Sequence, residues 1–285
     1  MIIVDYNGLC VGTVASQKLE LKEDIIRHVI LNQIRWIRSK FKNEYGEVVL
    51  AVDSGNTWRR DMFPFYKAKR REKRQTDKQD WQEVYRILDL IREEIKENFP
   101  YKVVKIDRCE ADDIIGVLVE DTQEFGKYEN VMIISADKDF IQLQKYKNVK
   151  QFSPLFKKFV SEDNPLSYLE THILKGDTAD GIPNVLSNDD VFVEGFRQTP
   201  LRQKRIDEII TDLSDGELLY AASWYRNYLR NKKLIDLSQT PEDLKKEIIN
   251  NFTNQDPWSN KGKVFPYMVS KRLNQLIQDV TEFIQ

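Results

Sequence analysis

Four short apolar segments of this chain each lead into acidic residues. They cover residues 2–4, 48–52, 103–106 and 131–136. The acids that follow them are, in chain order, Asp5, Asp53, Glu110 with Asp112 and Asp113, and Asp137 with Asp139. In an open parallel sheet the ligand crevice lies beyond the carboxyl ends of the strands. We therefore expect these acids to converge on one edge of a sheet.

The spacing of apolar residues predicts helices between these segments. Helical periodicity covers about 21–45, 80–98 and 111–125, the strands are expected at 2–5, 48–52, 102–106 and 131–135, and 149–152 reads as one more strand. This alternation predicts an α/β fold with a mostly parallel central sheet and helices on both faces. After residue 165 only helical patterns remain, near 165–175, 201–213, 216–231, 241–252 and 267–284. Thr240 is expected to cap the fourth of these, with Pro241 at its first position.

The chain length and composition limit the classes of protein to consider. A chain of 285 residues can bury one core and a smaller satellite. We expect an α/β domain over 1–175, with a basic arch at about 57–80, and a helical substrate-binding subdomain over 176–285. Two cysteines make no disulfide framework, and His28 and His172 are interpreted as structural residues of helices. Since no signal peptide or long apolar run is evident, we expect a soluble cytoplasmic protein without membrane contact, monomeric by default.

The acidic residues together indicate a metal site. So many carboxylates repel one another unless cations neutralise them, and all-oxygen clusters suit hard ions such as Mg²⁺ or Mn²⁺. Asp177 and Asp180, in a glycine-containing turn, could complete the set. Any one of these acids could be a helix cap or a solvated turn residue, but coincidence is a poor explanation for all of them. Residues two positions apart in a helix point about 200° away from each other. Glu110 and Asp112 can therefore both face the metals only if Glu110 lies before the helix that contains Asp112.

A basic segment directly follows the second strand. Residues 59–74 contain eight basic and two acidic side chains, a net charge of +6, interleaved with Phe63, Phe65 and Tyr66 and preceded by Trp58. Lysine and arginine contact phosphates and aromatic faces stack on unpaired bases, so this composition favours a single nucleic-acid strand. The residues expected to bind it are Arg59, Arg60, Tyr66, Lys69, Arg71, Lys73 and Arg74. A solvated helix face is the alternative, which the neighbouring acidic edge makes less attractive.

These motifs together resemble the flap endonuclease and 5′-nuclease superfamily, and within it the ribonuclease H group of tailed bacteriophages. The resemblance covers essentially the whole chain. The matching pieces are Val4-Asp5, Val52-Asp53 with Trp58-Arg59-Arg60, Tyr66-Lys67-Ala68-Lys69-Arg70, Glu110-Ala111-Asp112-Asp113, Ser135-Ala136-Asp137-Lys138-Asp139-Phe140 and Leu174-Lys175-Gly176-Asp177-Thr178-Ala179-Asp180. The family implies a PIN/5′-nuclease-like fold and 5′→3′ exonuclease and flap endonuclease activity, with removal of RNA primers from RNA–DNA hybrids in lagging-strand synthesis.

The resemblance also implies roles for individual residues. One Mg²⁺ would be held by Asp5, Asp53, Glu110, Asp112 and Asp137, and a second by Asp139 and Asp180, with Mn²⁺ as a substitute. Asp113 and Asp177 would assist through water, while Lys67 and Arg70 would contact the scissile phosphate. The substrates would be branched or 5′-flap DNA and RNA–DNA hybrids cut to 5′-phosphate products. A single-strand-binding protein or a polymerase clamp is a compatible partner, although no peptide motif identifies one.

One stretch departs from the family pattern. Many members follow the last metal aspartate with a Gly-rich helix-turn-helix that binds duplex and a potassium ion, whereas Gly181 leads here into an acidic stretch without a Gly-x-Gly hairpin. That site is therefore in doubt. The basic residues that could replace it in contacting phosphate are Arg197, Arg202, Lys204 and Arg205.

Three other classes of protein are alternatives to this interpretation. A haloacid-dehalogenase phosphatase needs a second aspartate where this chain has Asn7, and a PIN ribonuclease needs neither the basic arch nor the helical C-terminal third. A catalytically inactive module that binds branched DNA remains the alternative. It would be marked by loss of a metal aspartate, and no expected position has lost one.

Overall fold

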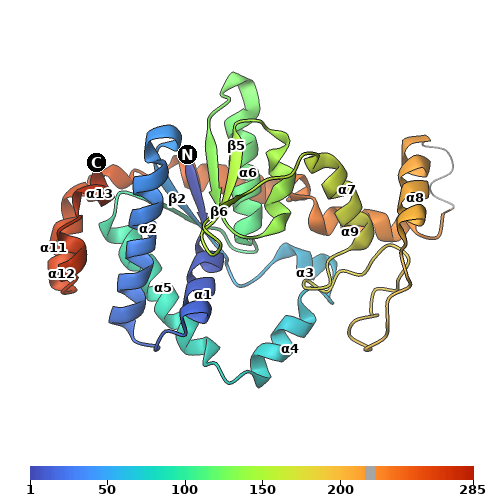
Figure 1. Cartoon of the computed structure of the whole chain (residues 1–285), viewed down its shortest axis with the longest axis horizontal. Coiled ribbons are helices and arrows are strands. Elements are labelled where there is room, and N and C mark those ends of the chain that lie inside the picture. The colour runs from blue at the N-terminus through green and yellow to red at the C-terminus, as the bar shows by residue number, and fades with distance from the viewer. Residues whose placement is uncertain (216–221) are drawn as a thin grey trace.

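The structure is a computed structural model that describes residues 1–215 and 222–285 (Figure 1). Its centre is a six-stranded sheet in the order β3-β2-β1-β4-β5-β6, parallel except for the antiparallel edge strand β6. The strands are β1 (Ile2–Asp5), β2 (Val48–Val52), β3 (Lys102–Lys105), β4 (Val131–Ile134), β5 (Val149–Ser153) and β6 (Lys158–Val160). The predicted mostly parallel α/β fold is confirmed.

Helices cover both faces of this sheet (Figure 1). The α-helices of the first part are α1 (Tyr6–Gln17), α2 (Glu23–Tyr45), α3 (Trp58–Met62), α4 (Ala68–Thr76), α5 (Trp81–Asn98) and α6 (Ala111–Gln123). The later ones are α7 (Pro165–Lys175), α8 (Gln203–Asp215), α9 (Tyr225–Ile235), α10 (Glu242–Thr253), α11 (Val264–Ser270), α12 (Asn274–Ile277) and α13 (Thr281–Ile284). Short 3₁₀ segments are η1 (Glu124–Gly126), η2 (Lys138–Lys145), η4 (Leu237–Gln239) and η5 (Pro257–Lys263). None of the described helices is both long enough and apolar enough to cross a membrane.

The strand side chains alternate between two cores. Ile2 and Val4 pack with α1, α2 and α5, whereas Ile3 packs on the opposite face with α6 and η2. Both faces of the sheet are therefore buried, as is usual for a parallel sheet. This explains why valine and isoleucine occur at consecutive positions of its strands.

The C-terminal helices pack into these same cores. Tyr267 and Phe283 join the core of α1, α2 and α5, and Leu244 of α10 joins the core beneath α6. In Figure 1, α11 to α13 lie beside α2, far from α8. The expected helical C-terminal third is present, but it wraps the sheet and depends on it for most of its burial.

Several local predictions need correction. No helix was expected at 6–17, where α1 forms, nor a strand at β6. The single helix expected over 267–284 is broken into α11, α12 and α13, with Arg272 in the left-handed region at φ 54°. Thr240 is not the N-cap of α10, because its hydroxyl bonds Leu237 and Asp113 and Pro241 stands at the cap. The helix expected at 216–231 begins at Tyr225, and residues 216–221 lie outside the described residues.

The turn after α7 accepts only glycine at position 176. Gly176 has φ 66°, and a Cβ there would lie 2.3 Å from the carbonyl oxygen of Ile182. The Ile182 N–H donates to the Asp177 carbonyl at 2.7 Å and closes the turn, and the absence of a side chain at Gly176 leaves room for this close approach.

We expect Gly176→Ala to lower the free energy of unfolding by about 2–3 kcal/mol, because it combines strain at positive φ with a backbone clash. Urea denaturation would measure the loss. Gly12→Ala is the matched control, since nothing lies within 4 Å of its added Cβ and α1 should gain slightly. An unchanged urea midpoint for Gly176→Ala would contradict this account of the turn.

Candidate metal centre and basic arch

The strand order places the acids of three neighbouring strands side by side. β1 lies between β2 and β4, and the direction of chain progression reverses at β1, which is where open α/β sheets form their ligand crevice. Asp5 is the last residue of β1, Asp53 directly follows β2, and Asp137 follows β4. The predicted convergence on one edge of the sheet is confirmed.

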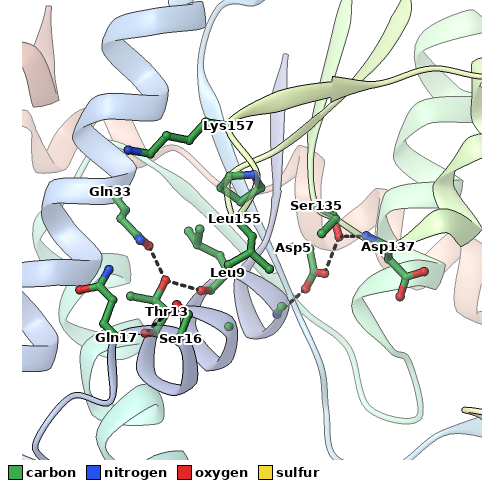
Figure 2. A pocket seen from close by; sticks show the side chains of 14 residues that line it. Asp5, Leu9, Thr13, Ser16, Gln17, Gln33, Ser135, Asp137, Leu155 and Lys157 are labelled. Atoms are coloured by element: carbon green, nitrogen blue, oxygen red, sulfur yellow. Dashed lines mark hydrogen bonds between the residues drawn. The ribbon is translucent and has the colours of Figure 1, made fainter.

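Asp5 and Asp137 are linked through Ser135. The Ser135 hydroxyl donates to Asp5 Oδ2 at 3.0 Å and accepts from the Asp137 backbone N–H at 3.1 Å. Asp5 Oδ1 accepts from the Gly8 N–H and so caps α1, and Asp137 Oδ1 accepts from the Asp139 N–H. Figure 2 shows this group at one end of a pocket of about 450 Å³ whose other end is formed by polar residues of α1 and α2.

The N-terminus of α6 adds the acids of the third segment. Glu110 is the residue that directly precedes α6. The sequence predicted this position, because only there can Glu110 face the same way as Asp112. Asp53 Oδ1 accepts from the Ala111 N–H at 2.7 Å, which ties the end of β2 to this helix start. No hydrogen bond or ion pair holds the Asp112 carboxylate within the described part of the chain, although Asp137, Glu110 and Asp5 lie near enough to influence its pKa.

The turn after α7 brings in the last acids together with a histidine. Asp177 Oδ1 accepts from the N–H groups of Ala179 and Asp180. His172 lies between two acids, with Nδ1 3.5 Å from Asp139 Oδ1 and Nε2 3.7 Å from Asp177 Oδ2, a group able to hold a metal ion. The sequence interpretation of His172 as purely structural missed this. Its position in the last turn of a helix that ends just before two aspartates was the available signal.

Burial and mutual repulsion raise the pKa values of most of these carboxyls. Burial, then the charges of Asp53 and Asp137, raise the pKa of Asp5 to about 7. Burial and Asp137 likewise raise the pKa of Asp139 to about 7, opposed by His172. The pKa values of Asp53, Asp112 and Asp180 are also raised, with burial as the main cause. The site therefore carries more negative charge than its surroundings neutralise.

Glu110 is the exception because cations touch it. Burial alone would raise its pKa, but Lys67 and Arg59 lower it to about 2. Lys67 Nζ lies 2.6 Å from Glu110 and 3.4 Å from Asp180, and Arg70 lies 2.9 Å from Asp180. Lys67 has φ 54° and donates its backbone N–H to the Asp180 carbonyl at 2.7 Å. The start of α4 is thereby fixed over the acids.

Three predicted site residues lie in the interior instead. Asp113 is fully buried and bonds Trp58, Arg59, Thr240 and the Glu110 N–H. Arg59 is 2% exposed and also donates to the Leu234 carbonyl, so its guanidinium does not face solvent. The Tyr66 hydroxyl is occupied by Glu110 and Asp180. These residues brace the site, and we do not propose Arg59 or Tyr66 for nucleic-acid contact or Asp113 for metal contact.

The other basic residues lie on an arch formed by α3 and α4. Figure 1 shows α4 extending away from the sheet between α3 and α5, and α4 buries none of its side chains. Lys69, Lys73 and Arg74 are exposed there, while Arg60 and Arg71 are half-buried. On the far side of the site, residues 183–200 form turns without a helix, so the helix-turn-helix of many relatives is not formed in that stretch.

An acidic sheet edge below a basic arch defines the class of metal-dependent nucleases. Residues 6–170 match the family of 5′-3′ exonucleases, N-terminal resolvase-like domain, and residues 166–283 match the T4 RNase H C-terminal family. The chain belongs to this 5′-3′ exonuclease and ribonuclease H family and is a phosphodiester hydrolase.

The relatives agree with this assignment. The chain is 32% identical to Ribonuclease H of Enterobacteria phage T4 over 99% of its own length and 95% of that protein. It is 29% identical to a 5′-3′ exonuclease of Buchnera aphidicola over 55% of this chain and 53% of the other. Among solved structures, T5 5′-exonuclease with bound zinc has a TM-score of 0.61 at 17% identity, covering 100% of this chain and 99% of the other. A T5 flap endonuclease complex with DNA and metal ions has a TM-score of 0.59 at 17% identity, covering 99% and 98%.

We expect Asp5→Asn to stabilise the metal-free protein at pH 8 by about 1–3 kcal/mol, because a carboxyl with a folded pKa near 7 is ionised there against its environment. The gain should fade as the pH falls from 7 towards 4, because the folded wild-type carboxyl is protonated below about 7 and the unfolded carboxyl becomes protonated near 4. Denaturation in EDTA would measure both. Asparagine keeps an oxygen to cap α1, so destabilisation at pH 8 would contradict the proposed repulsion.

Proposed function

We propose that the chain is a divalent-metal-dependent 5′→3′ nuclease acting on RNA–DNA hybrids, duplex DNA and 5′-flap structures. The observation that carries this is the contact of the arch base with the acidic edge, in which Lys67 pairs with Glu110 and Asp180 and Arg70 pairs with Asp180. A phosphodiester drawn by the basic arch would arrive where the acids gather. We also propose products with 5′-phosphates and removal of RNA primers in lagging-strand replication, as the resemblance of the motifs to the 5′-nuclease superfamily implies.

The acids suit two Mg²⁺ ions, with Mn²⁺ as a substitute. The donors are carboxylate oxygens, which hard divalent ions prefer, and their raised pKa values show unneutralised negative charge. We assign Asp5, Asp53, Glu110, Asp112 and Asp137 to the first ion, Asp139 and Asp180 to the second, and Asp177 to contact through water. Bound metal would lower the pKa of a water molecule and stabilise the leaving oxygen.

The protein's own residues would orient the substrate. Lys67 and Arg70 now pair with Glu110 and Asp180, and the same cations would exchange these partners for the scissile phosphate and stabilise its developing charge. Arg60, Lys69, Arg71, Lys73 and Arg74 would bind the 5′ single strand along the arch. The helical part over 176–285 would contribute to substrate binding.

The setting of this activity is also a proposal. We place the protein in the cytoplasm, that of the host if the chain is phage-encoded, as a monomer. A single-strand-binding protein or polymerase clamp would be its replication partner. The direct test of the function is cleavage of a 5′-end-labelled flap duplex with Mg²⁺ and with EDTA. Metal-dependent release of short 5′ products supports it, whereas binding without cleavage, with Mn²⁺ also tried, favours the inactive binding module.

Asp137→Asn should abolish cleavage while largely preserving affinity for flap DNA, because its exposed carboxylate serves the metals and asparagine keeps the oxygen that caps η2. Gel-based cleavage and fluorescence anisotropy would separate the two effects. Asp121→Asn, at the far end of α6, is the charge-matched control. Full activity of Asp137→Asn would refute the metal assignment.

Lys67→Ala should lower turnover by about 10²-fold or more and weaken binding only slightly, because one of many phosphate contacts is lost together with a transition-state contact. Single-turnover rates at saturating enzyme would measure this. Since Lys67 also neutralises Glu110, a thermal melt must show that the variant is folded. A weaker binding constant with unchanged turnover is the result that would overturn this role.

A further inference from the structure

A second cavity lies beneath the arch and reaches the acidic edge. It has a volume of about 340 Å³ and is lined by Asp53, Glu110 and Lys67 together with Arg60, Arg71 and Arg74. This size is at the low end of the range for small-ligand sites, about 300–1,000 Å³, and suits one nucleotide. The cavity thus combines part of the proposed catalytic site with these three arginines and with Lys105.

These three arginines differ from the other cations of the site. Arg59, Lys67 and Arg70 each have a carboxylate partner, whereas no ion pair joins Arg60, Arg71 or Arg74 to an acid within residues 1–215 and 222–285. Asp89 also lines the cavity, but its charge is engaged by Arg92 and Lys105. The arginine end of the cavity therefore has an excess of positive charge.

Arg60 and Arg71 show the cost of this excess most clearly. The Arg60 Nε is buried and has no hydrogen-bond partner. Burial and the neighbouring charge of Arg60 lower the pKa of Arg71, whose Nη1 donates only to the Tyr66 carbonyl. Arg74 is held over the rings of Trp81 and Tyr85, about 5.5 and 5.4 Å from their centroids. An anion bound in the cavity would relieve the repulsion between the Arg60 and Arg71 guanidiniums and accept hydrogen bonds from the arginine side chains that line it.

We propose that Arg60, Arg71 and Arg74 bind the 5′-terminal phosphate of the strand being degraded. A phosphomonoester carries nearly two charges and three free oxygens, which suits three guanidiniums better than an internal diester does. With the terminal phosphate at the arginines, the first phosphodiester lies towards Lys67 and the acids in the same cavity. This assignment rests on the proposed nuclease function and adds to it a preference for 5′-phosphorylated ends.

Binding can be tested without catalysis. Titration calorimetry of the full chain in EDTA would compare thymidine 5′-monophosphate with thymidine. We expect the monophosphate to bind more tightly, and Arg60→Gln and Arg71→Gln each to lose about 10- to 100-fold in affinity. Arg86→Gln is the matched control, because Arg86 lies on α5 outside the cavity and pairs with Glu83 and Glu23. Equal binding of both ligands, or equal loss in the control, overturns the proposal.

Cleavage then distinguishes a terminal phosphate from an internal one. Recessed duplexes with a 5′-phosphate should be degraded faster than the same duplexes with a 5′-hydroxyl, and Arg60→Gln should remove this difference and lower the rate on phosphorylated ends by more than it lowers the rate on long flaps. Equal rates on both ends refute the proposal but leave the nuclease intact. A loss on long flaps as large as that on phosphorylated ends assigns the arginines to an internal phosphate and also refutes it. If no substrate is cut, the proposed nuclease function fails. The calorimetry alone then tests whether the three arginines bind a 5′-phosphate.

Discussion

The repulsion among carboxylates at the carboxyl edge of the sheet is the constraint on which the rest of the site depends. Asp5, Asp53, Asp112 and Asp139 all have raised pKa values because they are buried close to one another. A fold tolerates such a cluster only where rigid elements hold it and cations complete it. The parallel sheet, buried on both faces, supplies the rigidity, and the arch base supplies the first cations through Lys67 and Arg70.

The same acids also build the local structure around them. Asp5 caps α1, Asp137 caps η2, and Asp53 binds the first N–H of α6. A single aspartate in a sequence can be interpreted as a helix cap or as a metal ligand. Here the two roles do not exclude each other. One oxygen orders the backbone, and the cluster as a whole keeps its charge. This explains why the acids stand at the junctions of strands and helices, where unpaired N–H groups are available.

Much of the fold was predictable because parallel strands and long amphipathic helices leave strong periodic patterns. β1 to β5, α2, α5, α6 and α7 were located close to their observed bounds. α1 was not predicted, because its glycines, threonine and valines are poor helix formers. The helix is stabilised by the Asp5 cap and by packing. The break between α11 and α13 was not predicted. Arg272 adopts a left-handed conformation there, which the amino-acid composition does not indicate.

The sequence by itself determined the acidic edge, since strand order along the chain and the rule of carboxyl-end crevices require those aspartates to meet. It also determined the basic character of the arch. Only the tertiary structure decided which members of these sets face outward. Asp113, Arg59 and Tyr66 belong to the same motifs as their neighbours, yet all three turn inward. Asp113 bonds Arg59, Trp58 and Thr240, and the Tyr66 hydroxyl bonds Glu110 and Asp180. His172 turns towards the acids, and among the described residues no carboxylate pairs with Arg60 or Arg71. For Asp113, Arg59 and Tyr66 the side-chain direction depends on contacts between residues more than 40 positions apart, which no local pattern encodes.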